Sequence, residues 1–190
     1  MIIIFEGCRN SGKTFLGNKI SENLNIPRFQ FDFSKYFSEL GLTSKNDRSS
    51  QAFSISKDLM LLQLNRDGFI KNDCIVDRGF LTVLAWGILE NRINEDEAFS
   101  QFDLLHSSGL LNDIVVIYIH GENPNKRSSH KDQWDEIEKS DLEKRSYETI
   151  LNYSREKNLN INLIRFENNF TDESITELSK IIENVRNFNK

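Results

Sequence analysis

Residues 1–14 read Met-Ile-Ile-Ile-Phe-Glu-Gly-Cys-Arg-Asn-Ser-Gly-Lys-Thr. A short apolar run is followed by Gly-x-x-x-x-Gly-Lys-Thr, and a helical run then continues to Leu24. This order of strand, glycine-rich loop and helix is typical of a loop that binds phosphates through backbone N–H groups and the positive end of a helix. We therefore expect the chain to bind a nucleotide. The predicted nucleotide-binding residues are Gly7, Arg9, Asn10, Ser11, Gly12, Lys13 and Thr14.

Two side chains of this loop have distinct expected roles. Lys13 is placed to reach the outer phosphates of a nucleoside triphosphate and to act in catalysis. The Thr14 hydroxyl is placed to bind a magnesium ion that bridges those phosphates. The alternative, a glycine-rich turn with a chance lysine, does not explain why strand, spacing and helix agree. ATP and Mg²⁺ are the expected cofactors.

Composition predicts a single soluble domain over residues 1–190. Hydrophobic residues make up 38% and charged residues 28%, and a mean hydropathy of -0.50 argues against a membrane span or a membrane partner. The apolar start is needed as a strand and is interrupted by Glu6, so it does not resemble a signal peptide. We expect a cytoplasmic protein in which Cys8 and Cys74 are thiols. The net charge of -5 argues against general binding to duplex DNA.

Strands and helices alternate along the chain. The predicted strands cover 1–6, 27–32, 72–77, 114–119 and 160–166. After the helix that follows the loop, the predicted helices cover 33–40, 49–65, 81–91, 95–107, 140–157 and 172–188. The alternation predicts an α/β fold, a five-stranded parallel sheet with helices on both faces. The polar, charge-rich segment at about 121–138 is predicted to be a mobile lid.

Charged residues lie at the ends of two of these strands, at the sheet edge where α/β proteins bind ligands. Asp77 is a candidate magnesium ligand, or alternatively caps the next helix. Arg78 is a candidate for two-point contact with a phosphate, or alternatively forms a salt bridge with a nearby acid. Asp32 is a candidate base for a hydroxyl acceptor, or alternatively a helix cap.

Together these features resemble the thymidylate kinases and the deoxynucleoside kinases. The resemblance rests on Phe5-Glu6-Gly7 before the loop, on Asp77-Arg78 with Thr82, Ala85 and Trp86 after them, and on the segment Trp134 to Tyr147. It covers nearly the whole chain in order and spacing, and it implies the P-loop NTPase fold of the nucleoside monophosphate kinases. It also implies that Arg127, with Lys126, closes onto the phosphates from the lid. Related kinases are commonly dimers, for which the apolar helix 81–89 is a candidate surface, although a core helix explains its pattern equally well.

The chain also departs from that pattern. Some thymidylate kinases carry a catalytic arginine in the loop, but Arg9 stands one position earlier and the loop acid is absent, so both Arg9 and Arg127 remain candidates for the catalytic arginine. Gly87 replaces a glutamine that lies near the base, so specificity for thymine is not expected. Base stacking would fall to an aromatic residue. The candidates are Phe33, Tyr36, Phe37, Phe53 and Phe80.

Three functions fit these residues. The first is transfer of the γ-phosphate of ATP to a deoxynucleoside or deoxynucleoside monophosphate. The second is transfer to a hydroxyl of a nucleic-acid end or of a modified base in DNA, which a basic groove of Lys45, Arg48, Lys57 and Lys71 would favour. The third is a P-loop ATPase or switch that has no phosphate acceptor.

Overall fold

The computed structural model describes residues 1–30, 48–121 and 137–188. In these ranges the strands form one parallel sheet in the order β2-β3-β1-β4-β5, which confirms the predicted fold class. The strands are β1 (Ile2–Glu6), β2 (Arg28–Gln30), β3 (Cys74–Asp77), β4 (Ile114–His120) and β5 (Leu163–Glu167). The helices are α1 (Lys13–Leu24), α3 (Arg48–Arg66), α4 (Phe80–Leu89), α5 (Glu95–Ser107), α6 (Ile137–Glu156) and α7 (Asp172–Phe188).

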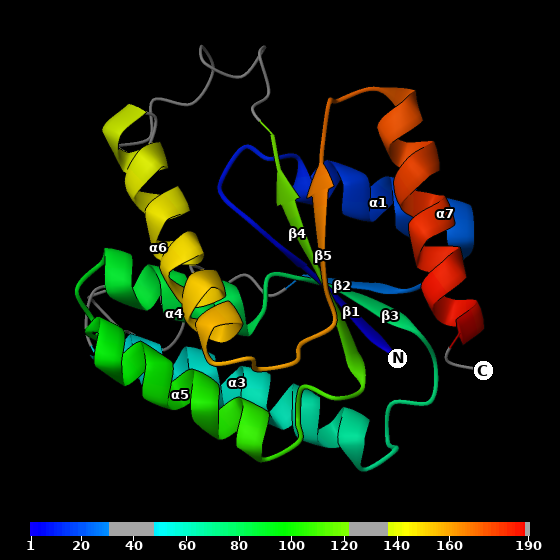
Figure 1. The fold of residues 1–190 in the computed structure, drawn as a ribbon. Coiled ribbons are helices and arrows are strands. Elements are labelled where there is room, and N and C mark those ends of the chain that lie inside the picture. Colours follow the sequence, from blue (N-terminus) through cyan, green and yellow to red (C-terminus); the bar gives the residue numbers. More distant parts are fainter. Residues whose placement is uncertain (31–47, 122–136, 189–190) are drawn as a thin grey trace.

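Alternate residues of the central strand β1 point into two separate cores. Ile2 and Ile4 pack in the core that α3, α4, α5 and α6 share with the sheet. Ile3 and Phe5 pack in the core formed with α1 and α7. Figure 1 shows α1 and α7 together on one side of the sheet, with the other helices on the opposite side. Since both faces are covered, the central strands are continuously apolar, as the sequence pattern predicts.

Helix α4 belongs to the core. It packs against α3, α5 and α6. Its buried residues are Phe80, Leu81, Thr82, Val83, Leu84, Ala85 and Gly87. The interpretation as a core helix is therefore correct. The prediction that Phe80 stacks on a base is also wrong, because its fully buried ring packs against Phe102 with 5.9 Å between centroids.

Two elements begin three residues away from their predicted starts. Helix α6 begins at Ile137 rather than Ser140, so the predicted lid extends two residues too far; the charged residues of this stretch are good helix formers. Strand β5 begins at Leu163, where its pairing with β4 begins, because the preceding asparagines disfavour a strand. The predicted helix 33–40 and residues 122–136 of the predicted lid lie outside the described residues.

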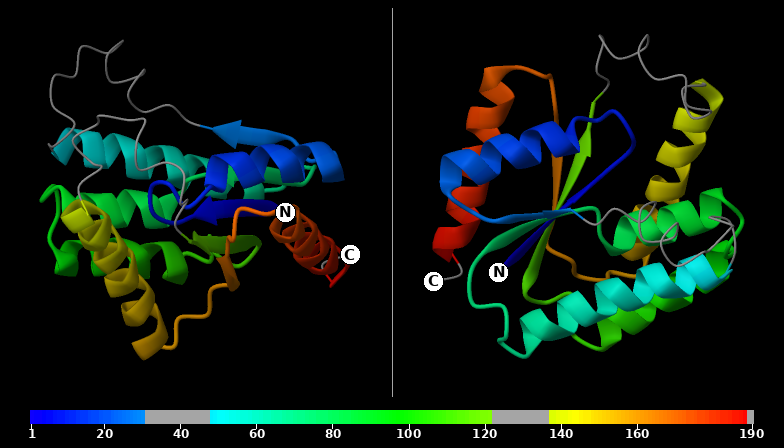
Figure 2. Two further views of the ribbon diagram at one scale, coloured as in Figure 1. Left: turned by 90° about the horizontal axis from the view of Figure 1, so that it is seen from above. Right: turned by 180° about the vertical axis from the view of Figure 1, so that it is seen from behind.

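The carboxyl ends and the amino ends of the parallel strands lie at two opposite edges of the sheet. The phosphate-loop sequence follows β1 at the carboxyl edge of the sheet, where β3 also ends with Asp77. The start of β1 and the end of α7 lie near each other at the other edge in both views of Figure 2. There Asp73 pairs with the amino group of Met1 at 3.2 Å and with Arg186 of α7 at 2.8 Å. Within the described ranges no helix combines the length and the apolar character that crossing a bilayer requires.

Candidate functional site

The phosphate loop between β1 and α1 has a backbone that only glycine fits at two positions. Gly7 has a φ of 133° and Gly12 a φ of 84°. A Cβ atom on Gly7 would lie 2.1 Å from the carbonyl oxygen of Ile119, and one on Gly12 would lie 2.2 Å from Nδ2 of Asn168. Both glycines therefore allow the tight turn and the close approach that a phosphate-binding loop needs.

Asn168 supports the loop from the end of β5. Its buried side chain donates from Nδ2 to the carbonyl oxygen of Ser11 at 2.8 Å and accepts at Oδ1 from the N–H of Phe170 at 2.9 Å. It thus fixes the turn of the loop before α1 begins. Asn168 was not predicted as part of the site, although a polar side chain at or just beyond the end of a strand is the signal that also pointed to Asp77.

The Lys13 ammonium group lies buried inside the loop. It donates to the carbonyl oxygen of Cys8 and to Oγ of Ser11. Burial and, to a smaller extent, the positive charge of Arg78 lower the pKa of Lys13 to about 8, although Glu143 and Asp77 oppose this effect. A lysine in this environment gains stability from a bound anion, which fits its predicted contact with phosphates.

Thr14 and Asp77 meet where β1 and β3 run side by side. The Thr14 hydroxyl donates to Oδ2 of Asp77 at 2.9 Å, and Arg28 of β2 donates to the same oxygen. The other oxygen, Oδ1, is buried and has no hydrogen-bond partner. No group of three or more His, Cys, Asp and Glu side chains that could hold a metal exists among the described residues. Mg²⁺ fits this pair nevertheless, because it takes one or two protein ligands and completes its shell with water and phosphate oxygens.

The residue that caps α4 is Glu6, at the end of β1. Its carboxylate accepts from the N–H groups of Gly79, Leu81 and Thr82 at 3.0 to 3.1 Å and from the Thr82 hydroxyl. The interpretation of Asp77 as the cap of this helix is therefore wrong, and its carboxylate is directed to Thr14 instead. Complete burial raises the pKa of Glu6 to about 7 despite these hydrogen bonds. The capping role of Glu6 was not predicted, although a carboxylate at the end of a buried strand is again the signal.

Replacing Glu6 with alanine is expected to lower the free energy of unfolding by about 3 kcal/mol, because buried donors at the start of α4 lose their acceptor. Urea denaturation at neutral pH would measure the change. Glu167→Ala is the matched control, since this exposed glutamate also ends a strand of the sheet. It should change stability by less than about 0.5 kcal/mol. An equally small effect of Glu6→Ala would show that water replaces the cap.

Arg9 and Arg78 both lie against Trp86 of α4, and we call these three residues the arginine platform. The guanidinium carbon of Arg9 is 4.5 Å and that of Arg78 is 5.7 Å from the centroid of the indole ring. The salt bridge considered for Arg78 is not present among the described residues. Arg78 has a φ of 72°, in the left-handed region, which is costly for a residue other than glycine and is often found at functional sites.

Several other predicted site residues are not among the residues that the structure describes. Asp32, Lys126 and Arg127 lie outside the described residues, as do Phe33, Tyr36, Phe37 and Lys45, while Phe53 is partly buried. The basic groove is not seen among the described residues. Arg48 pairs with Glu97 at 2.8 Å, Lys57 pairs with Asp58, and Lys71 precedes β3 at the edge opposite the loop.

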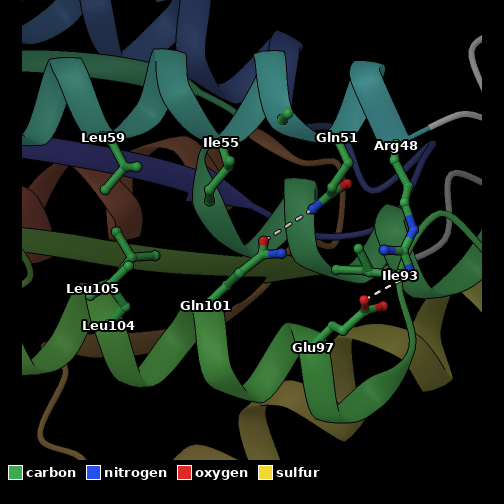
Figure 3. Close-up of a pocket in the computed structure, with 10 residues that line it drawn as sticks. Arg48, Gln51, Ile55, Leu59, Ile93, Glu97, Gln101, Leu104 and Leu105 are labelled. Atoms are coloured by element: carbon green, nitrogen blue, oxygen red, sulfur yellow. Dashed lines mark hydrogen bonds and ion pairs between the residues drawn. The ribbon is translucent and has the colours of Figure 1, made fainter.

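A separate cavity of about 300 Å³ lies between α3 and α5. Figure 3 shows Gln51 and Gln101 facing each other across it, and their side chains form a hydrogen bond of 3.4 Å. Apolar residues such as Ile55 and Leu59 line it together with Arg48 of the predicted basic groove, and no residue of the phosphate loop lines it. The cavity is therefore distinct from the phosphate loop.

Comparison with solved structures agrees with this geometry. The thymidylate kinase from Candida albicans matches with a TM-score of 0.64 and 17% identity over 98% of this chain and 92% of that chain. The deoxyadenosine kinase from M. mycoides, solved with dCMP and dCDP, matches with a TM-score of 0.60 and 17% identity over 98% and 99%. The shikimate kinase from Aquifex aeolicus matches with a TM-score of 0.55 and 16% identity over 98% of each chain. No family model and no curated protein sequence matches the chain.

The chain has the fold of the P-loop nucleoside and nucleotide kinases. This confirms the fold group that the sequence resembles. Because the identities are below one fifth, the comparison does not extend to the substrate.

Proposed function

We propose that this protein is an ATP- and Mg²⁺-dependent phosphotransferase that moves the γ-phosphate to a deoxynucleoside or deoxynucleoside monophosphate. The observation that carries the proposal is the 2.9 Å hydrogen bond between Thr14 and Asp77 beside the buried Lys13, inside a fold of the nucleoside and nucleotide kinase group. A hydroxyl and a carboxylate at this place are the groups that hold a magnesium ion on a triphosphate in P-loop enzymes.

The residues in and beside the loop have separate proposed roles in binding and catalysis. The loop N–H groups and Lys13 would hold the phosphates, and Thr14 with Asp77 would hold the magnesium ion. When bound, this ion neutralises charge on the outer phosphates. Arg78, on the arginine platform, is placed to contact the transferred group or the phosphate of the acceptor. Arg9 and Arg127 stay as the two candidates for the catalytic arginine.

The nature of the acceptor depends on Asp32. A carboxylate at this position would take the proton of an attacking hydroxyl, whereas a phosphate acceptor is already an anion and needs no base. Asp32→Asn should therefore reduce turnover of a hydroxyl acceptor by 10²-fold or more and leave the affinity for ATP unchanged. Steady-state kinetics with a nucleoside and with its monophosphate would measure the difference. Unchanged turnover of the nucleoside would make Asp32 a helix cap.

One assay separates the proposed function from its alternatives. The protein is incubated with γ-labelled ATP, Mg²⁺, and separate samples of deoxynucleosides, their monophosphates and oligonucleotides. Label in a small nucleoside or nucleotide supports the proposal. Label in an oligonucleotide supports the second function, which the pairing of Arg48 and Lys57 with acids makes less favourable. Label in free phosphate alone would support an ATPase and remove both kinase functions.

A further inference from the structure

We propose that Glu143 of α6 is a positioning residue for the phosphate loop, which fixes the first part of the loop and holds the arginine platform in place. This inference rests on the proposed function, because it concerns how the same loop is prepared for phosphate transfer. Glu143 is only 3% exposed, although it is an acidic residue. A buried carboxylate requires partners, and its partners here belong to the loop and the platform.

The first contact of Glu143 is with the backbone of the loop. The N–H group of Arg9 donates to both carboxylate oxygens, at 3.1 and 3.2 Å. Residues 7–14 contain no aspartate or glutamate, so α6 supplies the negative charge that the loop sequence itself lacks. Because this carboxylate takes the N–H of Arg9, a bound phosphate is left to N–H groups nearer the start of α1, such as those of Gly12, Lys13 and Thr14.

The second contact is with the arginine platform. Trp86 donates from Nε1 to Oε1 of Glu143 at 3.1 Å, which fixes the plane of the indole ring. Arg9 and Arg78 then share that ring, at 4.5 and 5.7 Å. Two guanidinium groups beside one ring repel each other, and a carboxylate at its edge reduces this repulsion. Glu143 therefore keeps both arginines beside the loop.

The experiment measures ATP binding and phosphate transfer in Glu143→Gln. The glutamine keeps the volume and an oxygen for Trp86, but it loses the charge. We expect a loss in kcat on the order of 10²-fold, since the loop and both arginines are less well placed. We also expect the affinity for ATP to fall, but by less than kcat, because the loop N–H groups that follow Arg9 still bind the phosphates. Binding is measured without an acceptor, so it remains informative if the wild type transfers phosphate to none of the acceptors.

Two further variants make the result specific. Glu143→Asp keeps the charge and should lose less kcat and less affinity for ATP than Glu143→Gln does, even if Glu143→Gln is less stable. Glu148→Gln is the control on the same helix, because this residue pairs with Arg165 rather than with the loop, and it should match the wild type in both measurements. The proposal is overturned if Glu143→Gln has the wild-type kcat and affinity for ATP, or if Glu143→Asp loses as much of both as glutamine does.

Discussion

Replacing Lys13 with alanine is expected to reduce kcat/KM for phosphate transfer by at least 10³-fold, the scale of losing a key charge at the transferred group. The ammonium lies inside the loop on the carbonyl oxygen of Cys8 and on Ser11, where it would meet the outer phosphates. The protein should stay folded, because burial already destabilises this charge and lowers its pKa to about 8. Steady-state kinetics and thermal unfolding of the same preparation would measure both properties.

Lys19→Ala is the matched control for this prediction. Lys19 lies on α1, as Lys13 does, but it is exposed and pairs with Glu22 at 3.3 Å. Its loss should leave kcat/KM within about twofold of the wild type, because exposed pairs contribute little. If Lys13→Ala retained kcat/KM within tenfold of the wild type, Lys13 would not contact the transferred phosphate. Thermal unfolding is measured in parallel, because a loss of activity in an unfolded Lys13→Ala variant would say nothing about the role of Lys13 in catalysis.

Much of the fold could be predicted because its signals are local. The bounds of α5 agree with the prediction at both ends, and its start is set by neighbouring residues. Asn94 accepts from the N–H of Glu97, and the side chain of Glu97 accepts from the N–H of Asn94. The conformation of the loop glycines was equally predictable, because a short motif encodes the turn that requires the positive φ of Gly7 and Gly12.

The supports of the site could not be predicted in the same way, because they join distant parts of the chain. Glu143 and the N–H of Arg9 are separated by 134 residues, and their contact depends on how α6 packs against α4. The spacing of Glu143, Tyr147 and Ile150 places them on one face of α6, and the structure buries Tyr147 and Ile150 fully. A buried charge on this face could therefore have been predicted, but its hydrogen-bond partner could not.

The role of Asp77 also depends on contacts between distant parts of the chain. A local rule makes it a helix cap, because an aspartate stands just before α4. Glu6 takes that role from the neighbouring strand and leaves the Asp77 carboxylate to Thr14 and Arg28. The choice between these interpretations depends on the pairing of β1 with β3, which places Phe5 opposite Asp77.

Replacing Asp77 with asparagine is expected to reduce Mg²⁺-dependent transfer by 10²-fold or more, by removing a charge that holds the metal on the phosphates. This substitution is conservative for the fold. The amide oxygen can accept from Thr14 and Arg28 as Oδ2 does, whereas the amide nitrogen takes the place of Oδ1, which has no hydrogen-bond partner. A donor then stands where an oxygen ligand for Mg²⁺ would be needed.

Nucleotide binding separates loss of the metal from loss of structure. The wild type should bind ADP more tightly with Mg²⁺ than with EDTA, whereas Asp77→Asn should bind ADP about equally in both conditions. Asp73→Asn is the control, because this aspartate pairs with Met1 and Arg186 just before the same strand, at the opposite edge of the sheet. It should keep the full effect of Mg²⁺. If Asp77→Asn also kept that effect, the carboxylate would serve only to anchor Arg28 and Thr14, and the metal would have to be held by Thr14 and the phosphates alone.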